Sequence, residues 1–511
     1  MHKQYNMKQL ILDIPTVYEP AKKHPAYQIN ELVEHMNFED LYHTARYPYH
    51  PALLLKLILF AYARGFRSGR QIERFADENK VAMWLTQGAV PSYRTINRFR
   101  VNHKIDDMIT QLRERLLALG LIDDVIFIDG TKILADANKY SFVWRKNTIR
   151  YSELNQTKAK QLIHEIQQTQ DDLPSLKQEN LSLDEMDEVI AHLEARIDDL
   201  NEQVRQTPKL SPNPAKQERR HVKSQTHHLQ KIKNKQSQYE QQQAIFGIRN
   251  SYSKTDHDAT FMRVKEDPML NGQLKPAYNV QMATNGQYIL NYDIFQRPTD
   301  TKTLIPFLNK MKDEQTLGSY IVADMGYGSE ANYRFLEDEM PEQTVLIPYG
   351  TMLRENSRKW QSDDRQVMNW EYDECRDEYT DKNGVLFTFH NYSKRTDKSG
   401  ITRDFKVYQA ESKDENNQII PEAFTPKQNV RRISINPAWE YQKAKIRDNL
   451  NNQTNTEIYA RCKIEVEPVF DRMKAHFGVT RFMVRGLEKV KREMGIVMVA
   501  MNMAKLSGRR G

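Results

Sequence analysis

Three acidic side chains that lie far apart in the chain are the residues best suited to chemistry. Asp129 follows the apolar run Val125–Ile128, and Asp324 follows the apolar run Tyr320–Ala323. Unbroken apolar runs of this length predict strands that are buried on both faces. An aspartate at the end of such a strand is costly unless a cation or a hydrogen-bond donor neutralises it. The third acid is a glutamate in residues 459–477, which predict a helix.

Carboxylate oxygens are hard ligands, so a set of them favours Mg²⁺ or Mn²⁺ over zinc. Two such ions would activate a water or a 3′-hydroxyl and stabilise the leaving oxygen of a phosphodiester in an in-line displacement. A lone aspartate after an apolar strand is usually an ordinary turn residue, so the prediction depends on the whole set in this order. Cys375 and Cys462 are the only cysteines, which excludes a disulfide framework and a cysteine-based zinc site.

The length, net charge and apolar segments of the chain limit the classes of protein to which it can belong. A chain of 511 residues predicts two to four domains. The net charge of +7 permits a nucleic-acid partner without requiring one. No secretory signal begins the chain, and the most apolar window, Ala52–Ala63, is shorter than the ~20 residues that cross a bilayer. We therefore expect a cytoplasmic protein with no membrane partner.

A mixed α/β sheet is predicted around the two aspartates. Gly130 lets the chain turn or approach another segment closely, so we expect the first strand to end at Asp129. The strands Tyr278–Ala283 and Tyr288–Phe295 are joined by a turn that contains an Asn-Gly pair. A helix follows, and then the strand of Asp324. Because ligands of open α/β sheets bind at strand ends, we expect the acids to meet there.

Two insertions interrupt this core. Residues 151–243 are rich in Gln, Glu, Asp and Lys, and they predict a helical coiled-coil hairpin with one acidic and one basic arm. The charges of the two arms pair with each other or face water in one interpretation, and they bind DNA in the other. Residues 349–455 are polar and irregular. The apolar seam of the hairpin repeats at steps of three and four, in Leu183, Met186, Ile190, Leu193, Ile197, Leu200 and Val204.

The N-terminal residues 1–115 predict helices only. A helix capped by Ser68 runs to Asn79, and a short basic helix over 92–100 follows a Gly/Pro break. A helix, a turn and a basic helix form the layout that enters a DNA major groove. A helical bundle with a solvated basic face is the alternative. The side chains expected on the outside of the basic helix are Arg94, Asn97, Arg98 and Arg100.

Several motifs together resemble the bacterial insertion-sequence transposases of the DDE class. This resemblance runs from about residue 45 to near Leu506. It implies an RNase H-like core that uses Mg²⁺ or Mn²⁺, as two ions, to cut the element at its terminal inverted repeats and to transfer the strands. The motifs are Ile128–Lys132, Tyr278–Gln281, Ala323–Tyr327, Glu465–Phe470 and Phe482–Val490.

The resemblance leaves a choice of third acid. The family motif places Tyr, Arg, the catalytic Glu and a Lys in series, with three residues between Arg and Glu and six between Glu and Lys. Counted from Glu467, the Lys is Lys474, but Lys463 stands at the Arg position and Ala460 at the Tyr position. We predict Glu467, because the local Val-Glu-Pro-Val-Phe also matches. Lys474 would then hold a DNA phosphate as a point charge.

Glu465 is the alternative third acid. Counted from Glu465, Arg461 fits the Arg position, but Arg472 replaces the Lys. In the preferred assignment the catalytic and metal-binding set is Asp129, Asp324 and Glu467. The DNA-binding set is Lys474, Arg461 and Lys463, together with the outer side chains of the basic N-terminal helix.

The resemblance also implies partners. The partners are double-stranded DNA, as inverted repeats and as target, and a second copy of the chain, because both ends must be cut in one complex. Such a protein is expected on the nucleoid. A nuclease without strand transfer and an inactive DNA-binding descendant of a transposase are the alternatives. The predicted parts are a DNA-binding domain (1–115), a catalytic core (116–150, 244–348 and 456–511) and the insertions (151–243 and 349–455).

Overall fold

The structure is a computed structural model, and its chain divides into two compact units. The first unit consists of Met1–Ile133, Asn279–Val484 and Glu488–Gly511, and the second of Leu134–Tyr278 and Arg485–Leu487. Of the region 1–115 that is predicted to be helical, residues 1–17, 36–48 and 103–105 lie outside the described residues. The structure describes residues 18–35, 49–102, 106–168, 181–207, 212–265, 272–397, 400–413 and 416–509.

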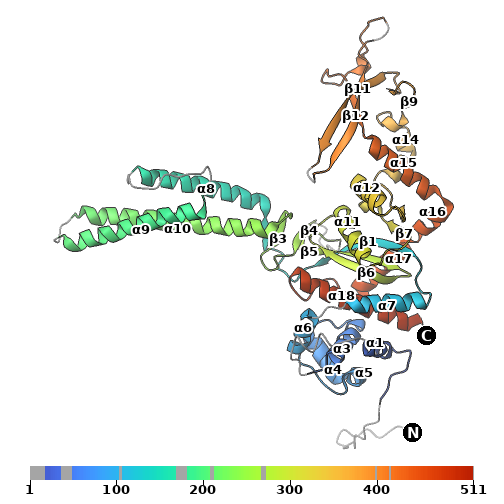
Figure 1. Cartoon of the computed structure of the whole chain (residues 1–511), viewed down its shortest axis with the longest axis horizontal. Helices are drawn as coiled ribbons and strands as arrows, with labels where there is room; N and C mark the ends of the chain where they lie inside the picture. Colours follow the sequence, from blue (N-terminus) through green and yellow to red (C-terminus); the bar gives the residue numbers. More distant parts are fainter. Residues whose placement is uncertain are drawn as a thin grey trace, which may run out of the picture. The chain divides into compact units, whose positions relative to one another are not determined.

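The sheet at the centre of the first unit is mixed (Figure 1). Its strands run in the order β6-β5-β1-β7-β8, and β4 pairs with the first residues of β5 in the second unit. Strands β1 and β7 are parallel, whereas β5 and β6 form an antiparallel hairpin. The α/β prediction is therefore confirmed. The strands are β1 (Val125–Leu134), β4 (Thr260–Arg263), β5 (Leu274–Asn285), β6 (Tyr288–Phe295), β7 (Tyr320–Ala323) and β8 (Thr344–Leu346).

Strand β1 does not end at Asp129 as predicted, but continues to Leu134. Its first four residues are buried, as their apolar character requires. Gly130 makes no turn; instead it allows a close approach. A Cβ at this position would lie 2.2 Å from Nε2 of Gln281 and 2.9 Å from Oδ1 of Asp300, both shorter than any normal contact.

The β5–β6 hairpin turns at Gly286 and Gln287, one residue later than the Asn-Gly pair suggests. Both residues have positive φ, 53° and 58°, because a two-residue turn must match the twist of its strands. Helix α18 (Leu487–Arg509) packs against β6. Asn502 of α18 accepts from the backbone N–H of Ile289 at 2.9 Å and donates to its carbonyl at 2.7 Å. These bonds tie α18 to the edge of the hairpin.

The N-terminal part of the first unit is helical, as predicted. The capping box forms with Ser68 at the N-cap and Gln71 three residues later, and the helix ends where Asn79 begins the next one. The helices are α1 (Pro25–Glu34), α3 (Pro51–Ala63), α4 (Gly69–Glu78), α5 (Lys80–Thr86), α6 (Tyr93–Asn102) and α7 (Asp106–Ala118).

The second unit contains three long helices, so the two-arm hairpin was wrong. Helix α10 (Pro214–Phe246) packs against both α8 (Arg145–Gln167) and α9 (Leu183–Gln206). The residues of the predicted seam are buried or partly buried, but apolar residues of α8 join them in the same core. Lys233–Asp187 and Arg196–Glu218 pair across α9 and α10. Some of the charged side chains of α9 and α10 therefore pair with each other.

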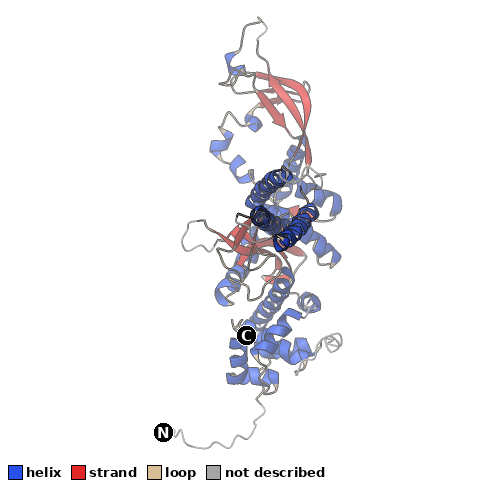
Figure 2. Ribbon diagram, turned by 90° about the vertical axis from the view of Figure 1, so that its left-hand side faces the viewer, coloured by secondary structure: helices blue, strands red, loops and turns tan. Residues whose placement is uncertain are grey.

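The insertion at 349–455 is more regular than predicted. It forms an antiparallel sheet in the order β13-β12-β11-β10-β9, whose strands are drawn in red in Figure 2. Trp370 and Phe387 pack in its core with ring centroids 4.9 Å apart. The strands are β9 (Glu371–Asp373), β10 (Glu378–Thr380), β11 (Leu386–Thr396), β12 (Thr402–Ala410) and β13 (Arg432–Ile435).

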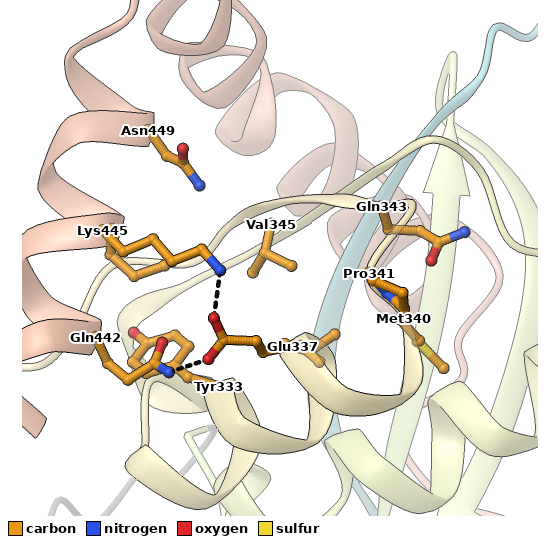
Figure 3. A pocket seen from close by; sticks show the side chains of 11 residues that line it. Tyr333, Glu337, Met340, Pro341, Gln343, Val345, Gln442, Lys445 and Asn449 are labelled. Atoms are coloured by element: carbon orange, nitrogen blue, oxygen red, sulfur yellow. Dashed lines mark hydrogen bonds and ion pairs between the residues drawn. The ribbon is translucent and has the colours of Figure 1, made fainter. Parts of the chain in front are cut away.

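A small hollow of about 140 Å³ lies between α12 (Glu330–Glu339) and α15 (Pro437–Asn451). Glu337 points into it and is held by Lys445, at 2.7 Å, and by Gln442 (Figure 3). The hydrogen bond from Lys445 lowers the pKa of Glu337. Lys445 already neutralises the carboxylate of Glu337. The contacts across the hollow therefore tie α12 to α15, and the hollow offers no reactive group. Within the described ranges, every helix is too short or too polar to cross a membrane.

Candidate active site

Asp129 and Asp324 lie at the same level of two adjacent strands. The parallel register pairs Val125 with Tyr320 and continues to Ile128 with Ala323. The next residue of each chain is an aspartate. Asp129 is half-buried within β1, whereas Asp324 is exposed just after β7. The structure therefore brings these two predicted residues together.

Each aspartate carboxylate accepts a backbone hydrogen bond nearby. Oδ1 of Asp129 accepts from the N–H of Gly130 at 2.7 Å, and Oδ1 of Asp324 accepts from the N–H of Gly326 at 2.7 Å. Asp324 is the N-cap of the 3₁₀ turn η2 (Met325–Tyr327). These bonds orient the carboxylates while their backbone remains part of the strand and the turn.

A polar network from other elements lies against Gly130. Asn279 and Gln281 of β5 are fully buried, and both donate to Oδ1 of Asp300, at 2.6 and 3.1 Å. The hydroxyl of Tyr327 donates to Oε1 of Gln281. Burial, and then the charges of Asp129, Asp300 and Asp324, raise the pKa of Tyr327 well above its usual value. The phenol thus stays protonated beside three carboxylates.

Asp300 is a residue that the sequence analysis missed. It begins the 3₁₀ turn η1 (Asp300–Lys302), and a polar segment separates it from the end of β6. A signal was nevertheless present, because Asn279 and Gln281 stand in an otherwise apolar strand. Buried amides require hydrogen-bond partners. Their partner is a further carboxylate in the neighbourhood of the two aspartates.

Helix α17 (Cys462–Asp471) carries both candidate glutamates, which differ in environment. Glu465 is only 8% exposed. Its Oε2 accepts from the N–H of Gln287 at 2.7 Å, and its Oε1 lies 3.4 Å from Nη2 of Arg461. Pro468 lacks an N–H, which leaves the carbonyl of Ile464 available, and the side chain of Gln287 donates to it at 3.1 Å. Glu465 thus fastens α17 to the β5–β6 turn.

Glu467 is exposed, and among the described residues its carboxylate makes no hydrogen bond or ion pair. The environment of the Cys462 thiol links Glu467 to the other acids, because the charges of all of them act on this thiol. Burial, and then the charges of Asp129, Asp324, Glu467 and Glu465, raise the pKa of the Cys462 thiol to about 12. A thiolate at this position would be repelled by all four carboxylates. The acids therefore share one neighbourhood around the start of α17.

The acids do not form a closed ligand set. Across the described part of the chain, no three His, Cys, Asp or Glu side chains are arranged to hold a metal ion. The donor type nevertheless fits Mg²⁺ or Mn²⁺, because the neighbourhood contains several carboxylates. The two aspartates are turned toward backbone N–H groups, and rotation about their side-chain bonds would release these oxygens.

The predicted DNA-binding residues near α17 have different environments. Arg461 pairs with Asp123 at 2.9 Å as well as with Glu465, and its guanidinium lies 5.2 Å from the centre of the Phe127 ring. Lys463 is exposed. Lys474 is partly exposed and belongs to the π-helical turn η5 (Arg472–His476) that continues α17. Arg461 therefore has a structural role in addition to any role with DNA.

On α6, Arg94 and Arg98 are exposed as predicted. Asn97 is partly buried, and a Cβ at Gly69 would lie 2.5 Å from its Oδ1, so this side chain packs against the start of α4. The outward position predicted for Arg100 is wrong. Its side chain is buried and donates to the carbonyl of Arg67 at 2.8 Å.

A buried ion pair explains the position of Arg100. Arg67 and Glu493 of α18 pair at 2.8 Å, and the Glu493 side chain has no exposed surface. Arg67 also donates to the carbonyl of Gly478 at 3.0 Å. Arg100 reaches the hydroxyl of Tyr62 at 3.4 Å in the same interior. These contacts join the N-terminal helices to α18 and withdraw Arg100 from the surface.

Comparison with known families adds two matches. The family model described as Transposase DDE domain matches residues 249–503, which include Asp324 and both glutamates. The family model described as Transposase domain (DUF772) matches residues 16–102, which include the α4–α6 helices. Asp129 lies outside both matched ranges. No curated protein and no solved structure matches the chain.

Proposed function

The chain belongs to the insertion-sequence transposases of the DDE class, and from this premise we propose that it cuts its element at the terminal inverted repeats and joins the ends to target DNA. The observation that carries the proposal is the register of β1 and β7, which sets Asp129 beside Asp324. Glu467, from a matched motif on α17, completes the proposed set.

We assign the core to the RNase H-like class. An antiparallel hairpin beside parallel strands, interrupted twice by inserted segments, agrees with the arrangement that the class implies. The buried apolar residues of α9, at steps of three and four, support a coiled-coil packing for the helical insertion.

Asp129, Asp324 and Glu467 would hold Mg²⁺ or Mn²⁺, in two ions. When bound, these ions supply the positive charge that activates a water or a 3′-hydroxyl and stabilises the leaving oxygen of a phosphodiester. The contribution of the chain is to orient the carboxylates. Asp129 is fixed on a central strand, and Asp324 begins a turn that Thr301 holds by donating to the carbonyl of Gly326 at 2.8 Å.

Glu467 is preferred over Glu465 because its carboxylate is not engaged by the fold. Glu465 accepts a backbone N–H and pairs with Arg461, and a metal ligand at this position would have to give up both contacts. Glu467 has an exposed carboxylate close enough to affect Cys462 together with both aspartates. This difference supports the assignment that the motif spacing favours.

Exposed or partly exposed basic side chains of two regions are the proposed DNA contacts. Lys463 and Lys474 lie on and after α17, beside the acids. Arg94 and Arg98 project from α6. Phosphates are neutralised by such side chains, so binding should weaken as salt is raised. We further propose that two copies act together, one for each end of the element, and that the protein is cytoplasmic and nucleoid-associated.

The test is nicking of a duplex that carries the terminal inverted repeat. Asp129→Asn should bind this duplex as the unaltered protein does and should not nick it in Mg²⁺. Normal nicking by this variant would refute the assignment. A target duplex added with a cut 3′-hydroxyl end separates a transposase, which joins the two, from a nuclease, which does not.

A further inference from the structure

We propose that a groove on the second unit binds an unpaired stretch of DNA. The groove is formed by β2 (Phe142–Trp144), the first turn of α8 and the loop before β3 (Ser251–Ser253). Its volume is about 340 Å³, and its lining residues are Trp144, Arg145, Lys146, Ile149 and Asn250. The proposal rests on the proposed function in one respect, that the chain acts on DNA.

An aromatic surface adjoins the groove, and Trp144 is its member that lines the groove. The rings of Phe142 and Trp144 lie 6.2 Å apart and both pack on buried Phe261, at 5.9 and 6.0 Å. Phe261 thus holds the two rings in place, while Phe142 remains 48% exposed and Trp144 is partly exposed. Ile149 adds a side chain that is 41% exposed. Exposed apolar groups that gather in this way mark a binding surface rather than scattered surface residues.

The charge of the same segment has one sign. Residues 137–152 contain four basic side chains and no Asp or Glu, and residues 241–255 also lack acids. Lys146 is exposed, and among the described residues it has no hydrogen bond or ion pair. Arg145 is held in place because it donates to the carbonyl of Gly247 and lies 5.5 Å from the centre of the Phe246 ring. The four basic residues are Lys139, Arg145, Lys146 and Arg150.

Aromatic rings beside basic side chains are suited to a nucleic-acid strand with accessible bases. The cations neutralise phosphates, and the rings stack on bases. A duplex offers its phosphates but covers the faces of its bases, so it would use the charges of the groove and not its rings. The ligand chemistry is therefore single-stranded DNA, or a duplex end whose bases have separated.

Photocrosslinking of the full chain tests this directly. The probe is a single-stranded oligonucleotide that contains 5-iododeoxyuridine, and the matched probe is the same strand in a duplex. EDTA is present, so binding is measured without cleavage. We expect the single strand to crosslink within residues 139–150, mainly at Trp144 or Phe142, and the duplex to crosslink there far less. Crosslinks only elsewhere in the chain would overturn the proposal.

Charge reversal supplies the second measurement. Lys146→Glu should weaken binding of the single strand by about tenfold, whereas Lys158→Glu, at an exposed position of the same helix outside the groove, should change it by no more than about twofold. Equal effects of the two variants would contradict the groove. So would a change in molecular mass with Lys146→Glu, because the surface would then join two copies. The outcome is independent of nicking, so the Asp129→Asn test can fail while this one succeeds.

Discussion

Asp129 and Asp324 follow the register partners Ile128 and Ala323 in parallel strands, although almost two hundred residues separate them in the chain. This pairing places two carboxylates at one level of the sheet. Parallel strands require a long connection, and here that connection includes the helical unit. The inserted residues leave the register of β1 and β7 unbroken.

The two glutamates of α17 should respond differently to removal. Glu467→Ala should lower nicking by at least about 100- to 1,000-fold and leave the free energy of unfolding almost unchanged, because its carboxylate supports no fold contact. Glu465→Ala should lower the free energy of unfolding by about 1–3 kcal/mol, because the N–H of Gln287 loses its partner and Arg461 loses one of its two carboxylates. Denaturant titration measures the free energy of unfolding of each variant, and a nicking assay measures its activity. If the stability loss fell on Glu467 instead, the assignment of roles would be reversed.

Gly130 should not tolerate a methyl group. Gly130→Ala would bring a Cβ to 2.2 Å from Gln281 and 2.9 Å from Asp300, so the network must shift. We expect a loss of about 1–3 kcal/mol in stability and a loss of nicking. Gly350→Ala is the control, since no atom lies within 4 Å of a Cβ at that position. Equal melting temperatures for the two variants would show that the network is not packed against Gly130.

Asp300 should affect the metal requirement. Asp300→Asn removes one negative charge near Asp129 and Asp324 and keeps the shape of the side chain. We expect the Mg²⁺ concentration for half-maximal nicking to rise by about three- to tenfold, because an opposite charge within a few ångströms contributes to cation binding. Asp338 is an exposed acid on α12, and Asp338→Asn should leave this Mg²⁺ concentration unchanged. A loss of stability with no change in the Mg²⁺ dependence would mean that Asp300 serves the fold alone.

The ion pair of Arg67 and Glu493 should be important for stability. Glu493→Gln leaves a buried guanidinium without its counter-charge, which costs about 3–5 kcal/mol. The exposed pair of Lys312 and Glu339, at 3.3 Å, provides the comparison, and Glu339→Gln should cost at most about 1 kcal/mol. Urea titration of both variants gives the two values. Similar losses of unfolding free energy for the two variants would show that water reaches Glu493.

Parts of this arrangement were accessible from the sequence because they depend on local pattern. The apolar runs before Asp129 and Asp324 predicted buried strands, and parallel pairing then placed the aspartates side by side. Ser68 predicted a helix start, since an N-cap side chain bonds to backbone groups only a few residues along the chain. Such features need no knowledge of distant segments.

The errors concern contacts between distant segments. Arg100 has the helical position of an outward residue, but Arg67 and Glu493 create a polar interior that accepts it. Gly130 was expected to end a strand, whereas its lack of a side chain admits Gln281 and Asp300. Asp300 was missed for the same reason. The apolar seam of α9 predicted packing between two helices, but apolar residues of α8 also belong to this core.

The central claim is that Asp129, Asp324 and Glu467 converge on one metal site, and metal-directed backbone cleavage tests it most directly. Fe²⁺ takes the place of Mg²⁺, and ascorbate with peroxide then cuts the chain near the bound ion. We predict cuts beside all three residues, which excess Mg²⁺ suppresses and Asp129→Asn removes. Cuts that lack any one of the three positions, or that persist in excess Mg²⁺, would contradict the claim.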